Sequence, residues 1–426
     1  MERLLLLSLV FSLLILGSLG CIGKPTSTEV AIPPVVKPTN ADKASPEDKA
    51  AVTRDSNQFA LDLFGRLDKQ SNLFFSPASI STALAMTYAG ARGQTAEQMA
   101  KVLHFQLDAK RLHPAFAALL WEMQGQGKPS GCRLSIANAL WGHKDTHFLP
   151  EFLQETNDNY GAALQQVDFA RAEDARRTIN GWVAQHTADK IKDLLQPGDV
   201  TPQARLVLTN AIYFKGDWLR PFKGNDTFDQ PFHVTKTKDE PVPMMHQTGQ
   251  FVHFTDEAKT FQLLEMPYKD SELSMVVLLP AQVDGLAQLE KKLDAESLAK
   301  WLEKAHPAKV QVTLPKFTMR SRLPLGDQLK AMGMTAAFDP EEAGFTGMTH
   351  DKPPLFISAV IHEAWVDVNE KGTEAAAATA VTMFAGGAAP GDQPVIFRAD
   401  HPFLFLIRDT RSGSILFLGR MSNPKS

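Results

Sequence analysis

The run at residues 369–378, Asn-Glu-Lys-Gly-Thr-Glu-Ala-Ala-Ala-Ala, constrains the fold of this chain more than any other segment. Alanine is the best helix former, so one interpretation is an alanine-rich helix. The other is an exposed loop that can later become a strand, because alternation places small side chains on one face. That face would hold Thr373, Ala375, Ala377 and Thr379. It could slide beneath other elements without a steric clash, while Glu374 would point to solvent.

Motifs elsewhere in the chain favour the second interpretation. They are NLFFSPASIS at 72–81, ALAMTYAGARG at 83–93, LVLTNAIYFKGDW at 206–218, LPKF at 314–317, DHPFLF at 400–405 and FLGR at 417–420. In this order they strongly resemble the serpin family of serine protease inhibitors, from about residue 50 to the C-terminus. Because several motifs occur in the family's order, the resemblance is far more specific than one alanine-rich run.

The resemblance implies an α+β serpin fold, with about eight or nine helices around three β-sheets and an exposed reactive-centre loop. Length alone suggests more than one domain. No Pro/Gly/Ser-rich linker interrupts residues 51–426, so we expect one serpin domain there. The composition, 44% hydrophobic and 22% charged, is ordinary for a soluble globular protein.

Hydrophobic spacing gives a coarse prediction of the elements. Apolar residues recur at helical spacing over residues 46–67 and 172–195. Ser76 and Pro77 are suited to cap and open another helix. The mostly apolar run at 206–214 is typical of a strand covered on both faces. Further predictions are helices at 95–103, 283–302 and 325–332, strands at 134–141, 273–279 and 310–319, and a segment at 357–368 that begins as a helical turn and ends as a strand.

The N-terminal residues form a separate unit. Residues 4–16 are almost wholly apolar, too short a run to span a bilayer comfortably but suited to a signal-peptide core. The Ser-Leu-Gly-Cys that follows resembles a bacterial lipoprotein cleavage site with Cys21 lipidated, although Ser18 stands where leucine is usual. We therefore expect a lipoprotein-type signal peptide at 1–20, a disordered tether at 21–50, and a prokaryotic, exported protein at the cell surface or in the periplasm. An ordinary secretory signal, giving an extracellular protein, is the alternative.

Conventional catalytic motifs are absent from the sequence. The nearest fragment to a Gly-x-Ser-x-Gly nucleophile elbow centres on Ser414, but Ser412 and Leu416 replace the glycines. His362-Glu363 begins like a zinc-protease motif, yet Val366 stands where the second histidine should be. No phosphate-binding glycine loop and no metal-spaced cysteine–histidine pair occurs. The sequence therefore favours a protein that is not an enzyme and takes no metal or cofactor.

The resemblance implies inhibition by a conformational trap. A serine protease cleaves the exposed loop, which then inserts as a new strand in the central sheet before the acyl-enzyme is hydrolysed. The inserting hinge needs small side chains, since a proline removes a ladder hydrogen bond and a buried charge lacks a partner. Matching the family's motif gives the hinge as Glu370, Gly372, Thr373, Ala375, Ala376, Ala377 and Ala378.

The same matching assigns two further groups of residues. The resemblance implies a "shutter" beneath the sheet, formed by Ser76, Ser79, Asn210 and His362. These residues could equally be a satisfied buried polar cluster with no switching role. The resemblance also implies a "breach" at the top of the sheet, formed by Trp218, Lys316 and Glu370. We predict that Lys316 pairs with Glu370, which adds little stability if the pair is exposed.

The scissile bond is placed by counting along the loop. The family's spacing from Glu370 gives the bond between Gly386 and Gly387. Counting back from the next strand gives Ala389 before a proline, a poor protease substrate, and the bond between Phe384 and Ala385 is a third option. No Lys or Arg lies between residues 374 and 397, which disfavours trypsin-like targets. Elastase-, subtilisin- or chymotrypsin-like proteases suit these small or aromatic residues better.

The predicted function is suicide-type inhibition of a serine endopeptidase. Two alternatives remain open: a non-inhibitory serpin-fold binding protein, or an inhibitor of a cysteine protease by the same trap. The expected partners are the target serine protease, in a covalent acyl complex, and a membrane reached through lipid on Cys21. The net charge of −4 argues against nucleic acid as a partner, and we expect a monomer.

Overall fold

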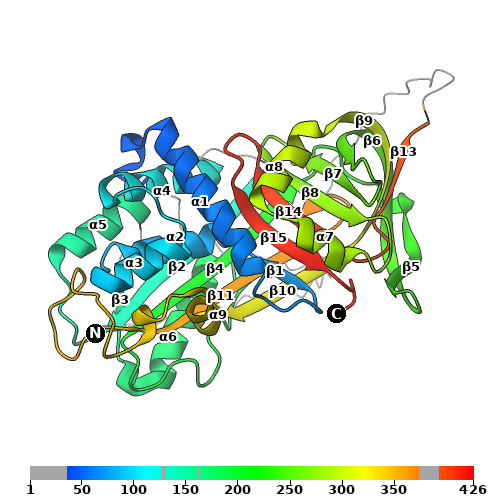
Figure 1. The fold of residues 1–426 in the computed structure, drawn as a ribbon. Helices are drawn as coiled ribbons and strands as arrows, with labels where there is room; N and C mark the ends of the chain where they lie inside the picture. The colour runs from blue at the N-terminus through cyan, green and yellow to red at the C-terminus, as the bar shows by residue number, and fades with distance from the viewer. Residues whose placement is uncertain (1–35, 126–130, 162–163, 374–392) are drawn as a thin grey trace, which may run out of the picture.

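The computed structural model describes residues 36–125, 131–161, 164–373 and 393–426 (Figure 1). These ranges contain nine α-helices and fifteen strands, which agrees with the α+β architecture expected from the sequence. The helices are α1 (Pro46–Phe64), α2 (Pro77–Tyr88), α3 (Gly93–Val102), α4 (Ala109–Met123), α5 (Pro150–Tyr160), α6 (Ala172–His186), α7 (Leu286–Lys292), α8 (Ala295–Lys304) and α9 (Gly326–Met332).

Local sequence signals fix several of the helix bounds. The Ser76 side chain accepts a hydrogen bond from the Ser79 backbone N–H, and Pro77 occupies the first turn of α2. The helix α9 ends at Met332, and the following Gly333 adopts a positive φ of 115° that residues other than glycine disfavour. Both helix predictions are therefore confirmed.

A six-stranded sheet has the strand order β10-β11-β12-β4-β2-β3. Its strands are β2 (Cys132–His143), β3 (Gln165–Val167), β4 (Leu206–Asp217), β10 (Phe317–Pro324), β11 (Ile357–Val368) and β12 (Gly372–Thr373). The central strand β4 is buried at every position from 206 to 214, as its continuous apolar run predicts.

A nine-stranded sheet has the order β1-β15-β14-β8-β7-β6-β9-β13, with β5 also pairing with β6. Its strands are β1 (Leu73–Phe75), β5 (Thr227–Thr235), β6 (Lys238–Thr255), β7 (Phe261–Pro267), β8 (Leu273–Pro280), β9 (His306–Pro315), β13 (Val395–Arg398), β14 (Phe403–Asp409) and β15 (Ile415–Met421). Two of the three expected sheets are continuous here. They are joined because β6 pairs with β5 through its first half and with β7 through its last residues.

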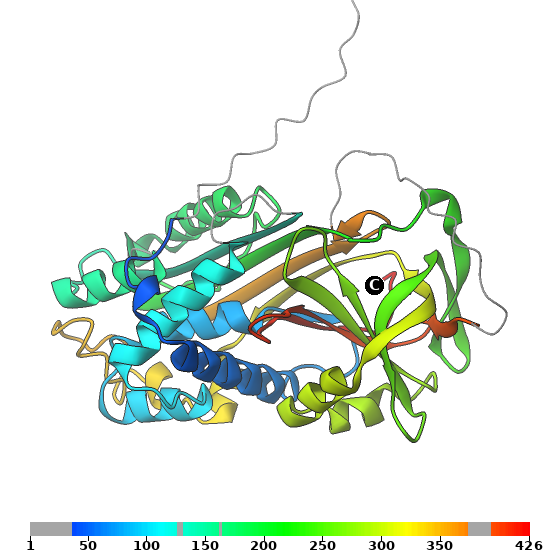
Figure 2. The same ribbon diagram turned by 90° about the horizontal axis from the view of Figure 1, so that it is seen from above.

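Helices cover both faces of the six-stranded sheet. Figure 2 shows α6 on one face, with α1 and α2 on the other. Ile179 and Val183 of α6 belong to the same buried cluster as Val207 and Ala211 of β4, and this core is separate from the main one. The opposite face of β4 contributes to the main core, which also contains residues of the nine-stranded sheet. Among the described residues, every helix is too short or too polar to cross a bilayer.

The disordered tether was predicted to reach residue 50, but residues 36–50 belong to the folded unit. From residue 36 onward the structure is described, with a 3-10 helix, η1 (Ala41–Lys43), and α1 beginning at Pro46. Asn40 donates a hydrogen bond of 3.0 Å from Nδ2 to Oδ1 of Asn159, and Ala41 is buried. The folded unit therefore begins before residue 51.

The helix predicted at residues 172–195 is shorter than expected. The helix α6 ends at His186, because Ala188 and Asp189 adopt positive φ values of 50° and 59°. Residues 187–199 then form an irregular connection across the six-stranded sheet, which we call the strap. Sequence periodicity failed here because Ile191 and Leu194 belong to the strap and are buried in the core beside α6, rather than on a face of that helix.

Three other elements have bounds that differ from those predicted from the sequence. Residues 283–302 form two helices, since Asp294 caps α8 by accepting a hydrogen bond from a backbone N–H. Residues 310–319 are divided between β9 and β10, which are separated at Lys316. The segment 357–368, expected to begin as a helical turn, is strand β11 throughout, because β10 and β4 supply ladder partners along both its edges.

Candidate functional site

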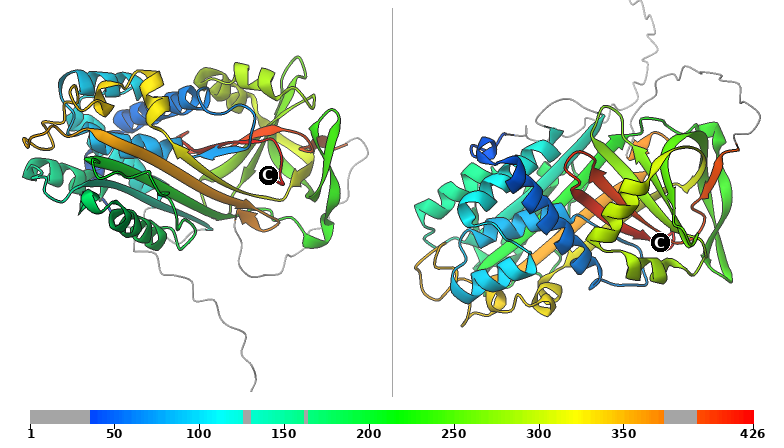
Figure 3. Two further views of the ribbon diagram at one scale, coloured as in Figure 1. Left: turned by 90° about the horizontal axis from the view of Figure 1, so that it is seen from below. Right: turned by 45° about the horizontal axis from the view of Figure 1, so that its top comes forward.

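The junction between β4 and β11, which we call the seam, is the centre of the site. The two strands pair in parallel from the Ile357–Leu206 pair to the Trp365–Tyr213 pair. Beyond that point the two strands separate (Figure 3). There β12 pairs with β11 on one side and with β4 on the other. The seam therefore has a closed end, where β4 and β11 bond directly, and an open end, where the beginning of the hinge has entered.

Glycine is required at the first position of β12. Gly372 lies opposite Asp217, and a Cβ at Gly372 would lie 2.0 Å from the Gly216 carbonyl oxygen. A tight turn precedes it, in which the Asn369 N–H donates to the Gly372 carbonyl at 2.8 Å. The predicted hinge glycine thus permits a backbone approach that any side chain would block.

Thr373 lies inside the sheet rather than outside it. It pairs with Gly216 on one side and Val368 on the other, and its side chain is fully buried. Its Oγ1 lies 2.8 Å from the hydroxyl of Tyr268, whose pKa burial holds well above the ordinary value. This corrects the expectation that the whole hinge is exposed, since a hydroxyl partner and ladder bonds stabilise its first residue within the sheet.

Trp218, predicted at the breach, anchors the turn that leads into β12. Its indole Nε1 donates a 3.0 Å hydrogen bond to the carbonyl of Asn369, and its backbone N–H donates one of 2.8 Å to the carbonyl of Lys371. Its ring stacks on Tyr268, with centroids 4.7 Å apart and an interplanar angle of 10°. One aromatic pair therefore contacts both the turn and the Thr373 hydroxyl.

The predicted pair of Lys316 and Glu370 is confirmed. The Lys316 Nζ lies 3.1 Å from Glu370 Oε2, and the two side chains are 42% and 20% exposed. Partial burial would raise the pKa of Glu370, but hydrogen bonds from its own backbone N–H and from Lys316 outweigh burial and lower the pKa. At this exposure the pair contributes little to stability.

The structure brings the four predicted shutter residues together. The Ser76 N–H donates to His362 Nε2 at 3.1 Å, and the other ring nitrogen, Nδ1, bonds to Asn210 Oδ1 across the seam. The Asn210 Nδ2 donates to Ser79 Oγ at 2.7 Å. All four residues are buried. The cluster therefore links β11, β4 and the start of α2 through one polar network.

Asn138 of β2 belongs to the same network and was not identified from the sequence. Its Oδ1 accepts hydrogen bonds from Ser79 Oγ, at 3.0 Å, and from Asn210 Nδ2. A strand was predicted over 134–141, and an asparagine among its apolar residues was the available signal. Its partners could not be inferred, because they depend on the pairing of β2 with β4.

The hydrogen bonds fix the protonation of His362. Because Nε2 accepts from a backbone N–H, the proton of the neutral ring resides on Nδ1 and is donated to Asn210. Complete burial lowers the pKa of His362 to about 3. The imidazole is thus neutral at physiological pH and acts as a cross-seam donor.

The described residues offer little for conventional catalysis. Ser414 is fully buried, which removes it from any substrate. His362 and Glu363 are adjacent in β11 and hence point to opposite faces of the sheet, so they cannot share a metal ion. Within the ranges that the structure describes, no cluster of three or more His, Cys, Asp or Glu side chains could hold a metal.

Several predicted site residues fall outside the described ranges. They are the hinge residues Ala375, Ala376, Ala377 and Ala378, the candidate scissile residues Phe384, Ala385, Gly386, Gly387 and Ala389, and Cys21. Of the hinge, the structure places Glu370, Gly372 and Thr373 at the open end of the seam. Their assigned roles remain predictions.

Comparison with known proteins agrees with this geometry. The family described as Serpin (serine protease inhibitor) matches residues 54–424. The leukocyte elastase inhibitor of Xenopus laevis is 44% identical over 375 residues, which cover 86% of this chain and 97% of that protein. The Homo sapiens leukocyte elastase inhibitor is 42% identical over 379 residues, covering 87% of this chain and 98% of that protein. The chain belongs to the serpin family.

Solved structures show the same fold. Uncleaved ovalbumin is 33% identical, with a TM-score of 0.79, and the match covers 88% of this chain and 100% of ovalbumin. Human thyroxine-binding globulin is 31% identical, with a TM-score of 0.81 and coverage of 88% and 99%. The serpin fold expected from the sequence is confirmed.

Proposed function

We propose that this serpin inhibits a serine endopeptidase by cleavage of its reactive loop and insertion of that loop into the seam. One observation carries the proposal: β12 already occupies the open end of the seam, paired with both β4 and β11. The direction and register of the next strand are thereby set before any cleavage. An inhibitor that only blocks an active site needs no position prepared for a new strand.

The register can be continued past Thr373. With Thr373 opposite Val368 and Gly216, six further residues along an inserted strand would place Thr379 between His362 and Asn210. The incoming strand would break the hydrogen bond between those two side chains, and the threonine hydroxyl would offer each a new partner. The small residues predicted on this face would fit a buried site without displacing the core beneath it.

The chemical step would be ordinary acyl transfer. The protease serine hydroxyl attacks the scissile carbonyl carbon, the C–N bond breaks, and the new amino terminus leaves with the proton. An ester bond between the serine Oγ and the scissile carbonyl carbon then joins the protease to the N-terminal half of the loop. Insertion of that half into the seam would draw the protease away from its starting position and distort its site before water cleaves the ester.

The expected target class is elastase-like, with subtilisin- or chymotrypsin-like proteases as further candidates. Support comes from the lack of Lys and Arg between residues 374 and 397 and from identities above 40% to leukocyte elastase inhibitors. The bond between Gly386 and Gly387 is the first candidate for cleavage. Phe384 before Ala385 would instead suit a chymotrypsin-like pocket.

Mixing the purified protein with a panel of serine and cysteine proteases tests the proposal. We expect an SDS-resistant adduct with an elastase, and mass spectrometry of its released peptide would identify the scissile bond. Loop cleavage should also raise the melting temperature by roughly 10 °C or more, since a new buried strand adds many kcal/mol. Cleavage with neither an adduct nor a change in melting temperature would indicate a non-inhibitory binding protein, and an adduct with a cysteine protease alone would change the target class.

We also propose export and membrane anchoring through lipid on Cys21, with the folded domain acting as a monomer. Support is confined to the N-terminal sequence, where an apolar segment at 4–16 precedes the cysteine, and the prokaryotic lipoprotein-type membership rests on the same residues. Expression of the full chain in a bacterium, followed by detergent partitioning, tests the anchor. Cys21→Ser should move the protein from the detergent phase to the aqueous phase, and an unchanged distribution would exclude lipidation.

A further inference from the structure

A single lysine contacts an aromatic ring on each side of the seam. Tyr213 of β4 and Trp365 of β11 are paired across it, with ring centroids 5.7 Å apart. The Lys190 ammonium lies 5.0 Å from the centroid of the Trp365 ring and 5.8 Å from that of the Tyr213 ring. Both distances permit a cation–π attraction, so one charge attracts both strands on the face toward α6.

The strap holds Lys190 in place because it is anchored on either side of this residue. Toward α6, Thr187 Oγ1 accepts a hydrogen bond of 3.2 Å from the Ile191 N–H. Beyond the lysine, Arg322 of β10 donates through Nε to the Leu194 carbonyl at 2.6 Å. The strap therefore passes from α6 across β11 to β10, and its anchors do not depend on the lysine.

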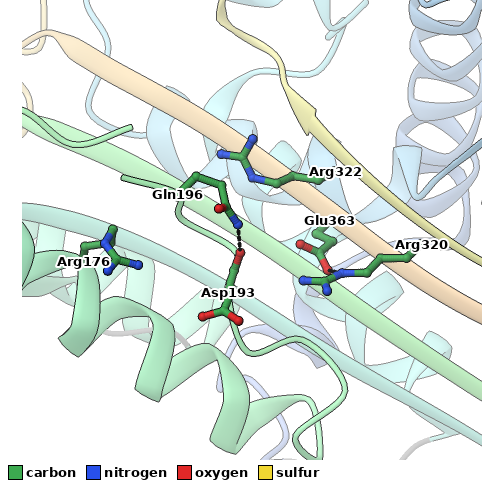
Figure 4. Close-up of a pocket in the computed structure, with 6 residues that line it drawn as sticks. All are labelled: Arg176, Asp193, Gln196, Arg320, Arg322 and Glu363. Atoms are coloured by element: carbon green, nitrogen blue, oxygen red, sulfur yellow. Dashed lines mark hydrogen bonds and ion pairs between the residues drawn. The ribbon is translucent and has the colours of Figure 1, made fainter. Parts of the chain in front are cut away.

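Charged side chains secure the far end of the strap (Figure 4). They surround a cavity of about 340 Å³, lined by Arg176, Asp193, Gln196, Arg320, Arg322 and Glu363. Arg322 pairs with Asp199 of the strap, and Arg320 pairs with the buried Glu363 of β11. Since these arginines already face carboxylates of the protein, we interpret the cavity as an anchor for the strap rather than a ligand site.

The position of Lys190 above both rings depends on the closed seam. With Thr373 opposite Val368, an inserted strand would place residue 376 beside Trp365 and, on its other edge, beside Tyr213. Neighbouring strands lie about 4.8 Å apart, so one inserted strand would separate β4 and β11 to about 9.6 Å. The ammonium already lies near the limit of about 6 Å, at 5.0 and 5.8 Å from the two centroids. If the strap holds it at its present height above the strands, it would move beyond about 6 Å from at least one ring as the strands separate. Opening the seam would therefore break at least one of the two contacts.

We propose that Lys190, Tyr213 and Trp365 form a latch that holds the seam closed and limits the rate at which the loop inserts. The effect of the latch on inhibition rests on the proposed function: the latch would change the fraction of encounters that end in a trapped protease. Slow insertion allows the acyl-enzyme to hydrolyse and releases cleaved inhibitor, whereas fast insertion traps the protease. A stronger latch would keep the uncleaved loop out of the sheet for longer, but it would also lower the fraction of protease that is trapped.

The test replaces the charge while keeping the length of the side chain, with Lys190→Met. Lys192→Met is the matched control, because Lys192 lies on the same strap, is 63% exposed and, among the described residues, forms its ion pair with Asp189 at 4.0 Å. Lys190→Arg should restore the cation–π contacts. Hydrogen exchange of the β4 and β11 amides in the uncleaved protein measures seam opening, and rapid mixing with a leukocyte elastase measures the rate of adduct formation and the fraction of cleaved, uncomplexed inhibitor.

We expect Lys190→Met to accelerate exchange at the seam and insertion by roughly 5- to 30-fold, because two cation–π contacts are lost and each contributes roughly 2- to 5-fold, and to reduce the uncomplexed fraction. Lys190→Arg and Lys192→Met should stay within about twofold of the wild type, as exposed charges usually do. Equal exchange and insertion rates for Lys190→Met and Lys192→Met would overturn the latch. If the wild type forms no adduct with any protease, the inhibitory function fails, while the exchange measurement still decides whether the latch exists.

Discussion

The open and closed ends of the seam hold the same two strands by different means. At the open end, β12 already separates them, and the contacts are local: a glycine that permits close approach, a hydroxyl pair and a stacked aromatic pair. At the closed end, β4 and β11 bond directly, with the shutter network on one face and Lys190 over two rings on the other. Under the proposed mechanism, the open end would guide insertion of the loop and the closed end would resist it.

The largest effect is expected at the open end, from Thr373→Arg. Arginine beside Tyr268 would carry a charge into a buried site, and an uncompensated buried charge costs roughly 3–5 kcal/mol. We expect the hinge to leave the sheet, so that proteases cleave the loop without being trapped. Gel analysis after mixing with an elastase measures the adduct, and Thr373→Ser, which keeps the hydroxyl, serves as the control. Full inhibition by the arginine variant would remove the hinge from the proposed mechanism.

At the closed end, His362→Ala should destabilise the protein at neutral pH. Without the imidazole, Asn210 Oδ1 and the Ser76 N–H each lose the hydrogen bond to His362 in a buried site. Each unsatisfied buried group costs roughly 1–3 kcal/mol, so we expect a total loss of roughly 2–5 kcal/mol. Urea unfolding at pH 7.5 measures this loss, and no change in the transition midpoint would mean that the network does not stabilise the seam.

The same histidine gives a pH dependence of known sign. Burial lowers its pKa to about 3, below the ordinary 6.5, so its folded-state contribution is complete above pH 6.5 and is lost as pH falls toward 3. In that window the wild type should lose about 1.4 kcal/mol per pH unit more than His362→Ala. His113, whose pKa burial lowers to about 4, contributes the same trend to both proteins and therefore cancels in the comparison.

Glu363, the next residue of β11, should show the opposite trend. Burial raises its pKa above the ordinary 4.5, and Arg320 offsets only part of that rise. Stability from the neutral carboxyl is present below pH 4.5 and is lost as pH rises through the raised pKa. Glu363→Gln should therefore be at least as stable as the wild type at pH 8, and the difference should vanish toward pH 4. A variant that is markedly less stable at pH 8 would show that the ion pair outweighs burial.

The smallest effect is expected from Lys316→Ala at the open end. This ion pair is exposed to solvent on the lysine side, so its loss should change the free energy of unfolding by less than about 1 kcal/mol. The change should shrink further in 1 M salt, because mobile ions screen exposed charges. Thermal unfolding at low and high salt measures it. A loss comparable to that of His362→Ala would mean that the open end resists separation as strongly as the closed end.

Local sequence signals predicted many helices and strands but few of the contacts that hold β4 and β11 together. The continuous apolar run of β4, the Ser76 cap and the glycine after α9 act over a few residues, so the sequence was sufficient to place them. Lys316 and Glu370 were paired correctly because ordered motifs located both at the breach. The α6 boundary and the helical start of 357–368 were wrong, since apolar spacing alone does not distinguish a helix from a buried strap or strand.

By itself, the sequence determined the family, the small side chains that follow Thr373 and the polar residues gathered beneath the sheet. Only the tertiary structure decided that Thr373 lies inside the sheet, that Asn138 completes the shutter network and that Lys190 reaches a ring on each strand of the seam. The physical reason is the same in each case. These contacts join elements far apart in the chain, and strand register, which arises from pairing between them, decides which side chains meet.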